Sequence, residues 1–175
     1  LSDPILTNVT ISGNTSIGNG GGMYLHLSDL ILTNVTISGN TSNENGGGMS
    51  LHVGSDPTLT NVTISGNTSN WNGGGIVLDA SNPTFTNVTI SGNTATNTGG
   101  GIFCYNNSNP TLLNTILWDN GANEVSFNGA FDSNSITISY SDIQGGQDSI
   151  ATNDNGTVIW GDGNIAADPL FVEPD

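Results

Sequence analysis

The segment PTLTNVTISGNTSNWNGGGIVL, residues 57–78, contains both signatures that decide the fold. The first signature, NVTISGNT, recurs at residues 8–15, 34–41, 61–68 and 87–94, and a diverged copy, NTILWDNG, occupies 114–121. The second signature is a triple glycine, which begins at residues 20, 46, 73 and 99. Both signatures recur every 26 or 27 residues. A fixed period of this length is typical of a solenoid, in which each repeat forms one structural unit.

Within a repeat the hydrophobic pattern has a period of two residues, which predicts short strands. Apolar and hydroxyl residues alternate over residues 62–65, and apolar residues lie two apart in 76–78. Dense asparagine, glycine and serine between these runs oppose helix formation. We therefore expect two or three short strands per repeat. Such a repeat cannot bury its apolar face alone, so successive repeats should stack into a coil of parallel strands.

Stacking places equivalent residues of successive repeats in columns that run along the coil. Three columns are apolar in every regular repeat, and we predict that they face the interior. They consist of Val9, Val35, Val62 and Val88; of Ile11, Ile37, Ile64 and Ile90; and of Leu25, Leu51, Leu78 and Cys104. Because its column neighbours are leucines, Cys104 is predicted to be a buried small hydrophobic residue rather than a reactive thiol.

Asparagines form two further columns, which we predict to be structural ladders at corners of the coil. The first contains Asn8, Asn34, Asn61, Asn87 and Asn114, and the second contains Asn14, Asn40, Asn67, Asn93 and Asn120. Asparagine tolerates the left-handed conformation of a sharp corner, and its amide can bond to the same amide one turn above and below. We expect the ladder amides to be buried and therefore closed to glycosylation, although many lie in NVT or NTS sequons.

The repeat unit resembles those of secreted bacterial right-handed parallel β-helix proteins in the pectin-lyase-like class. It is more distantly similar to polymorphic outer-membrane protein repeats, through its GGGM or GGGI signature, although the phenylalanine-bearing motif of that family is missing. The resemblance implies an all-β, right-handed, single-chain parallel β-helix with 26–27 residues per coil and roughly 6–7 coils. It also implies a secreted or cell-surface location. The class contains enzymes, adhesins and structural proteins, so the likeness alone does not select an activity.

The regularity of the repeat divides the chain into two parts of one domain. Residues 1–120 are expected to form regular coils, and residues 121–175 to form degenerate final coils with a C-terminal cap or docking segment. The segments NEVSF, SITISYSDI and TVIWGDGNI in the second part still have strand-like patterns. Leu1 falls inside a repeat, and we interpret the chain as a piece of a longer precursor.

The charge of the chain excludes several functions. It contains no lysine or arginine and has a formal net charge of −15, so binding to nucleic acid, phosphoryl chemistry and attraction to anionic membranes are all disfavoured. No apolar run is long enough to insert into a membrane. The lyases of the resembling class use an arginine or lysine base, which this chain lacks. Their hydrolase relatives carry aspartate and histidine clusters, and we find no such motif.

We therefore predict a non-catalytic extracellular structural or adhesive solenoid, without a cofactor, which contacts surface glycans or further copies of itself as a fibre or surface layer. The main alternative is a carbohydrate-binding or polysaccharide-cleaving module. For carbohydrate binding, the candidate residues are Trp71 and Trp118, because both occupy columns of solvent-facing residue types. A minor alternative is ice binding through the threonine and serine rows of the NVTIS tracts.

Two columns of ionisable residues are weaker candidates for metal binding. Asp3, Asp29 and Asp56 recur one repeat apart and would repel one another, which a calcium ion between coils would relieve. The simpler interpretation is that each begins an Asx-type turn. His26 and His52 share another column, continued by Asp79 and Tyr105, but two imidazoles are too few ligands for a convincing metal site.

Overall fold

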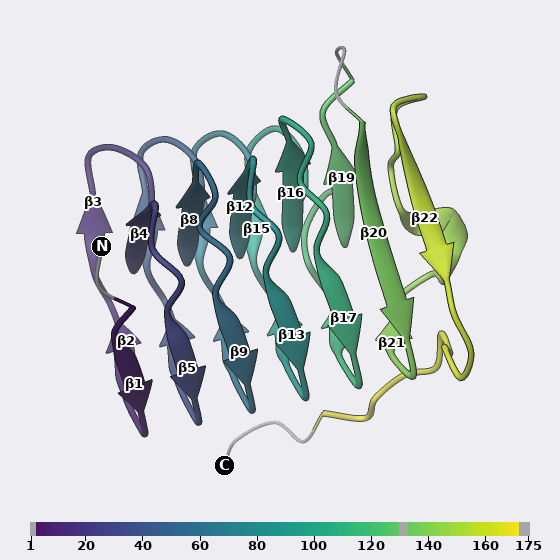
Figure 1. Cartoon of the computed structure of the whole chain (residues 1–175), viewed down its shortest axis with the longest axis horizontal. Coiled ribbons are helices and arrows are strands. Elements are labelled where there is room, and N and C mark those ends of the chain that lie inside the picture. Colours follow the sequence, from purple (N-terminus) through teal and green to yellow (C-terminus); the bar gives the residue numbers. More distant parts are fainter. Residues whose placement is uncertain (1–2, 130–132, 172–175) are drawn as a thin grey trace.

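The chain coils into a rod of stacked turns in which every strand lies beside its counterpart in the next repeat (Figure 1). The structure, a computed structural model, describes residues 3–129 and 133–171. All strand pairings among the described residues are parallel, and in the regular coils each joins residues one repeat apart, such as Ile64 with Ile37 and Ile90. The expected parallel solenoid is confirmed, with about six turns.

The described strands form four sheets that run along the rod. Sheet A contains β1 (Ile5–Thr7), β5 (Ile31–Thr33), β9 (Thr58–Thr60), β13 (Thr84–Thr86), β17 (Thr111–Leu113), β20 (Asn134–Ser139) and β22 (Gly156–Trp160). Sheet B contains β2 (Thr10–Ser12), β6 (Thr36–Ser38), β10 (Thr63–Ser65), β14 (Thr89–Ser91), β18 (Ile116–Trp118) and β21 (Asp142–Ile143). Sheet C contains β3 (Thr15–Ser16), β7 (Thr41–Ser42), β11 (Thr68–Ser69) and β15 (Thr94–Ala95). Sheet D contains β4 (Met23–His26), β8 (Met49–His52), β12 (Ile76–Asp79), β16 (Ile102–Tyr105) and β19 (Val125–Phe127).

Each regular coil contains four strands, whereas the sequence pattern indicated two or three. The additional strand is the two-residue member of sheet C, for example β11, which is too short to show an alternation of apolar and polar residues. It exists because the backbone bends at Gly66 before it, where φ is +61°. Glycine adopts this left-handed conformation without the steric cost that a side chain would add.

The three apolar columns form the core of the rod, as predicted. Val62, Ile64 and Leu78 are each at most 1% exposed, and Cys104 is fully buried in register with Leu78. At the first coil, Val9 and Ile11 pack against the same core but are only partly buried. At the other end the same holds for Val158 and Trp160 of β22. One continuous core therefore fills the coils between these two ends.

The triple glycine allows successive coils to approach each other more closely than any side chain would permit. A Cβ atom on Gly74 would lie 2.5 Å from both the amide nitrogen and the carbonyl carbon of Thr94 in the next coil. Real Cβ atoms essentially never come this close to backbone atoms. In this space the backbone N–H of Gly74 donates to the carbonyl oxygen of Gly99 at 3.1 Å. The glycine signature thus joins the loops of adjacent coils backbone to backbone.

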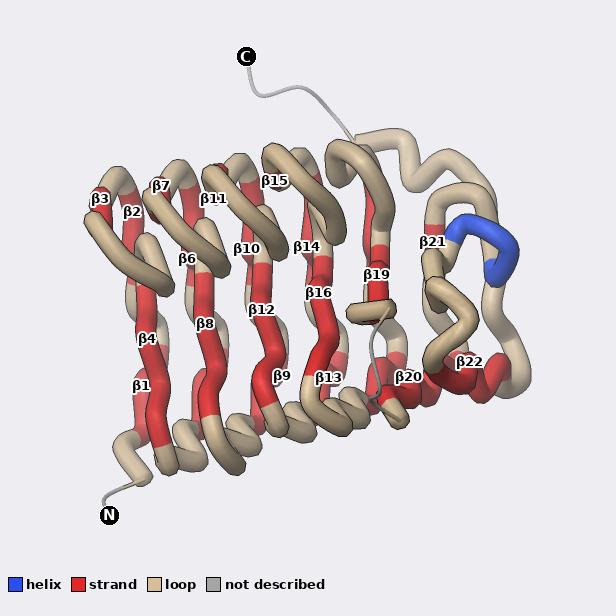
Figure 2. Tube along the Cα trace, turned by 90° about the horizontal axis from the view of Figure 1, so that it is seen from above, coloured by secondary structure: helices blue, strands red, loops and turns tan. Residues whose placement is uncertain are grey.

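The coil after β18 is shorter than those before it. The chain takes nine residues from Asn93 to Ile102 but only five from Asn120 to Val125, and Ile102 pairs with Val125. The four missing residues are those that would have made the next strand of sheet C, so this sheet ends at β15 (Figure 2). A 3₁₀ helix, η1 (Gln147–Ser149), lies beyond β21 at this end of the rod. Sheets A, B and D continue through the strand-like segments that the sequence indicated.

Candidate functional sites

The first asparagine column lies on the surface of the rod, at the corner between sheets A and B. Asn34 and Asn61 both have φ of +55°, the left-handed conformation predicted for this corner. The side-chain amide of Asn34 donates to Oδ1 of Asn8 at 3.1 Å, and Asn61 donates in the same way to Asn34 at 3.2 Å. These residues are exposed, so the expectation that the ladder amides are buried is wrong for this column. The column also contains Asn87, which donates to Asn61, and Asn114.

The second asparagine column is internal and fully hydrogen-bonded. Oδ1 of Asn67 accepts from the backbone N–H and the side-chain amide of Asn40, at 2.9 and 3.0 Å. Nδ2 of Asn67 donates to the carbonyl oxygen of Ile37 and to Oδ1 of Asn93, each at 2.9 Å. All four bonding positions of the carboxamide are therefore used. The same pattern holds at Asn40, Asn93 and Asn120. Asn14, in the first coil, begins the ladder: it is exposed, and its backbone N–H and side-chain amide donate to Oδ1 of Asn40.

The prediction that this second column adopts the left-handed conformation is wrong. That conformation belongs to the preceding residue, which is Gly39 at φ +61° before Asn40 and Gly66 at φ +61° before Asn67. Before Asn120 the preceding residue is Asp119, at φ +56°. The glycine makes the corner, which leaves the asparagine free to point its side chain inward.

Glu124 terminates the internal asparagine ladder, and the sequence patterns did not single it out. Its Oε2 accepts a 2.6 Å hydrogen bond from Nδ2 of Asn120, and its Oε1 accepts one of 3.2 Å from the backbone N–H of Asn120. The residue is 4% exposed. Burial raises the pKa of Glu124; the two hydrogen bonds oppose the rise, and the charge of Asp119 adds to it. Val125 pairs with Ile102, so Glu124 occupies the position that Gly101, the third glycine of the signature, has in the preceding coil. A glutamate at this position was the signal that the sequence offered.

A hollow of about 400 Å³ opens where sheet C ends, beside Glu124. Asn120, Glu124 and the loop residue Ala122 line one side. Gln144 and Asp148, from the segment around η1, line the other. Ala122 has φ of +74°, a conformation that is unusual for a residue with a Cβ atom. The hollow is a consequence of the shortened coil, which could not be anticipated without knowing the register.

The aspartate column forms an inter-coil ladder of backbone-to-carboxylate hydrogen bonds, and the Asx-type turn expected from its sequence position stays a prediction. The backbone N–H of Asp29 donates to Oδ1 of Asp3 at 3.2 Å, and that of Asp56 donates to Oδ1 of Asp29 at 2.8 Å. These carboxylates are exposed. Over residues 3–129 and 133–171, no group of three histidine, cysteine, aspartate or glutamate side chains is placed to hold one metal ion. Calcium binding at Asp3, Asp29 and Asp56 stays a prediction.

The two candidate tryptophans differ in their surroundings. Trp71 lies in the loop between β11 and β12 and is 54% exposed. Its backbone N–H donates to the carbonyl oxygen of Glu44 at 3.2 Å, so the loop that presents the indole is tied to the coil before it. Trp118 of β18 pairs in register with Ser91 and is only partly exposed. The structure therefore presents Trp71 more openly than Trp118, and it does not place the two side by side in register.

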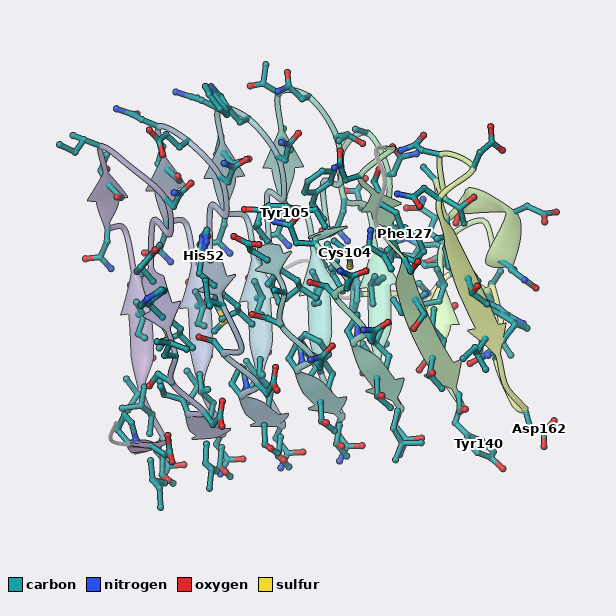
Figure 3. All side chains as sticks on the ribbon, turned by 45° about the horizontal axis from the view of Figure 1, so that its top comes forward. His52, Cys104, Tyr105, Phe127, Tyr140 and Asp162 are labelled. Atoms are coloured by element: carbon teal, nitrogen blue, oxygen red, sulfur yellow. The ribbon has the colours of Figure 1, made fainter. Side chains whose placement is uncertain are left out.

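His52, labelled in Figure 3, is the centre of a polar chain on sheet D. The hydroxyl of Ser50 lies 2.8 Å from Nε2 of His52, and Nδ1 of His52 lies 2.9 Å from Oδ2 of Asp79. The order hydroxyl, imidazole, carboxylate is that of a serine hydrolase triad. Ser50, however, is fully buried, so a substrate cannot reach its oxygen in this arrangement. The ring of Tyr24 packs on His52 with 4.9 Å between centroids.

These features define a parallel β-helix whose coils are joined by inward and outward amide ladders. The chain matches the family described as "Right handed beta helix region" over residues 6–167, and it belongs to that family. Searches among curated proteins and among solved structures gave no match. Within the described part of the chain, no helix has the length and apolar character needed to span a membrane.

Proposed function

We propose that the protein is a stiff extracellular rod with a structural or adhesive role and without catalytic activity. The internal ladder from Asn14 to Glu124 carries this proposal. Asn40, Asn67 and Asn93 are each bonded to both neighbouring coils, and four parallel sheets run along the rod beside the ladder. Bending or separating two coils would break backbone and buried side-chain hydrogen bonds together. Leaving buried polar groups unpaired is costly, and this favours a rigid rod.

The composition of the surface supports the same role. The outward positions of sheets A and B are mainly threonine and serine, for example Thr60, Thr63 and Ser65. The chain contains no lysine or arginine, so it offers no site to trypsin-like proteases and neither of the side chains that the lyases of the resembling class use as a base. In the regular coils the strands of sheets A and B are uncharged and hydroxyl-rich, which suits a long-lived extracellular component. Stacking turns any charge in the repeat into a row of like charges, as the aspartate column in the turns illustrates. The same rows are the basis of ice binding, which stays a prediction.

Self-association through the ends of the rod is the assembly that we propose. The edge strands β1 and β22 each pair on one side only within the described residues. The core residues beside them, including Ile11 and Trp160, are only partly buried. Unpaired strand edges with adjacent apolar surface favour addition of further strands. A second copy of the chain is the partner that we propose for these edges.

Concentration-dependent light scattering combined with electron microscopy tests this assembly. We expect elongated particles that grow along one axis as the concentration rises. A chain that stays monomeric at high concentration would exclude end-to-end assembly but leave the single rod as an adhesive unit. Resistance of the folded chain to a protease of broad specificity tests the rod itself, and rapid digestion at many internal sites would contradict it.

Glycan binding is the second candidate, and the exposure of Trp71 favours it. An indole that is half exposed on a loop anchored by backbone hydrogen bonds can stack on the apolar face of a sugar ring. A glycan array on the wild type and on Trp71→Ala tests this candidate, with reducing-sugar release measured in parallel. Binding that is lost in the variant, without sugar release, supports adhesion. Sugar release would overturn the non-catalytic proposal.

A further inference from the structure

Glu124, which lines the hollow, is a buried carboxyl group, and the chain has no lysine or arginine to pair with it. Buried carboxylates in proteins are normally paired with a cation or with several hydrogen-bond donors. Glu124 is 4% exposed and receives two hydrogen bonds, both from Asn120. A carboxylate has about four acceptor positions, so about two of them are unused by the described residues. No lysine or arginine exists in the chain to fill them.

The surroundings of Glu124 add further negative charge. Asp148 lines the hollow from the segment around η1, and Asp119 lies close enough for its charge to act on Glu124. Asp119 thus acts on Glu124 directly, and Asp148 adds a second carboxylate to the lining of the same hollow. Together they attract cations and repel anions, and the attraction is stronger in a partly enclosed hollow than in open water.

The size and lining of the hollow distinguish between a bare metal ion and a larger cation. About 400 Å³ lies within the range of roughly 300–1,000 Å³ that is typical of sites for small organic molecules. No three metal-ligating side chains converge there or elsewhere in the described residues. The lining includes Ala122 and Ala151, whose side chains are apolar and suit a carbon skeleton better than a hydrated ion.

We propose that this hollow binds a small organic compound that carries a primary ammonium group, with the ammonium at Glu124 and the carbon skeleton against Ala122 and Ala151. An ammonium group offers three donors to the acceptor positions that Asn120 leaves open. Asp148, at the exposed side of the hollow, contributes attraction at longer range. The carrier of the ammonium group is an alkyl chain or a sugar ring. This site does not depend on the proposed assembly of the rod.

Calorimetric titration of the full chain with n-butylamine and with glucosamine tests the site, with n-butanol and glucose as uncharged counterparts. We expect saturable binding of at least one amine and none of the uncharged compounds. The two amines distinguish an alkyl carrier from a sugar carrier. Affinity should decrease as the pH is lowered and Glu124 takes up a proton, because the charge that holds the ammonium group is then lost.

Three variants locate the binding. Glu124→Gln should weaken amine binding at least tenfold, whereas Glu44→Gln, the same change on a distant loop, should leave it unchanged. Asp148→Asn changes an exposed residue that is not part of the ladder, and it should weaken amine binding a fewfold. This second variant keeps the proposal testable if Glu124→Gln does not fold. Equal affinity in the wild type, Glu124→Gln and Asp148→Asn would overturn the proposal. So would the absence of amine binding, or saturable calcium binding in its place.

Discussion

Oδ1 of Asn67 accepts two hydrogen bonds from Asn40, one from its backbone N–H at 2.9 Å and one from its side-chain amide at 3.0 Å. Both residues are fully buried. A single side-chain oxygen therefore satisfies two donors of the preceding coil, and the pattern repeats at every coil boundary up to Asn120. The stability of the stack thus depends on a buried oxygen that is present at the same place in each coil.

Replacing Asn67 with alanine should destabilise the protein by about 3 kcal/mol or more, because two buried donors of Asn40 lose their acceptor. Asn61→Gly in the same coil is the matched control. It removes two exposed 3.2 Å hydrogen bonds, one to Asn34 and one from Asn87, while keeping a residue that tolerates φ of +55°, so its cost should be about 1 kcal/mol. Urea unfolding followed by circular dichroism measures both. Equal losses would show that the internal ladder adds nothing beyond the surface ladder.

Gly74→Ala should prevent adjacent coils from packing closely against each other. The new Cβ atom would lie 2.5 Å from backbone atoms of Thr94, and backbone cannot move aside as a flexible side chain can. We expect loss of the cooperative transition or a cost above about 3 kcal/mol. Gly66→Ala is the control: its Cβ atom meets nothing within 4 Å, and only its φ of +61° is unfavourable, at about 1–2 kcal/mol. If the two variants unfold alike, close coil contact is not what the triple glycine provides.

The sequence determines the regular coils more completely than it determines the sites. Period-two alternation and the recurrence of the asparagine and glycine signatures suffice for the coil, the parallel pairing and the buried column that contains Cys104. They do not reveal which residue of a Gly-Asn pair makes the corner, since both types tolerate positive φ. Glu124 and the hollow depend on the loss of four residues from one coil. The contact between His52 and Asp79 depends on side-chain rotamers across two coils, which no column pattern specifies.

The pH dependence of stability should contain a distinct contribution from Glu124. Burial raises its pKa in the folded state, so the folded protein binds this proton more tightly than the unfolded chain does. Between the ordinary and the raised pKa, the free energy of unfolding therefore falls as the pH rises. Above this window Glu124 is ionised in both states, and its burial destabilises the fold to the full extent. Glu124→Gln should remove this pH-dependent contribution. The amide keeps one acceptor oxygen for the two donors of Asn120, which adds a cost that does not vary with pH.

Unfolding free energies of the wild type and Glu124→Gln between about pH 4 and pH 8 give the contribution of Glu124 as a difference. The carboxylates that do not interact with Glu124 contribute equally to both proteins and cancel. The stability of the variant relative to the wild type should rise with the pH between the ordinary and the raised pKa of Glu124. A wild type that is more stable than the variant near neutrality and loses this advantage on acidification would have the opposite sign, and would show that hydrogen bonds from Asn120 outweigh burial.

The thiol of Cys104 should be unreactive in the folded protein. Its side chain is fully buried in the column that contains Leu78, and this burial raises the pKa of the thiol well above its usual range. Because only the thiolate is nucleophilic, a disulfide reagent should modify Cys104 at the rate at which the coils open and not at the rate of a free thiol. Absorbance of the released chromophore, measured with and without denaturant, gives the two rates. Stoichiometric labelling of the native chain as fast as that of the unfolded chain would mean that the core around β16 opens readily, which the continuous ladder beside it should prevent.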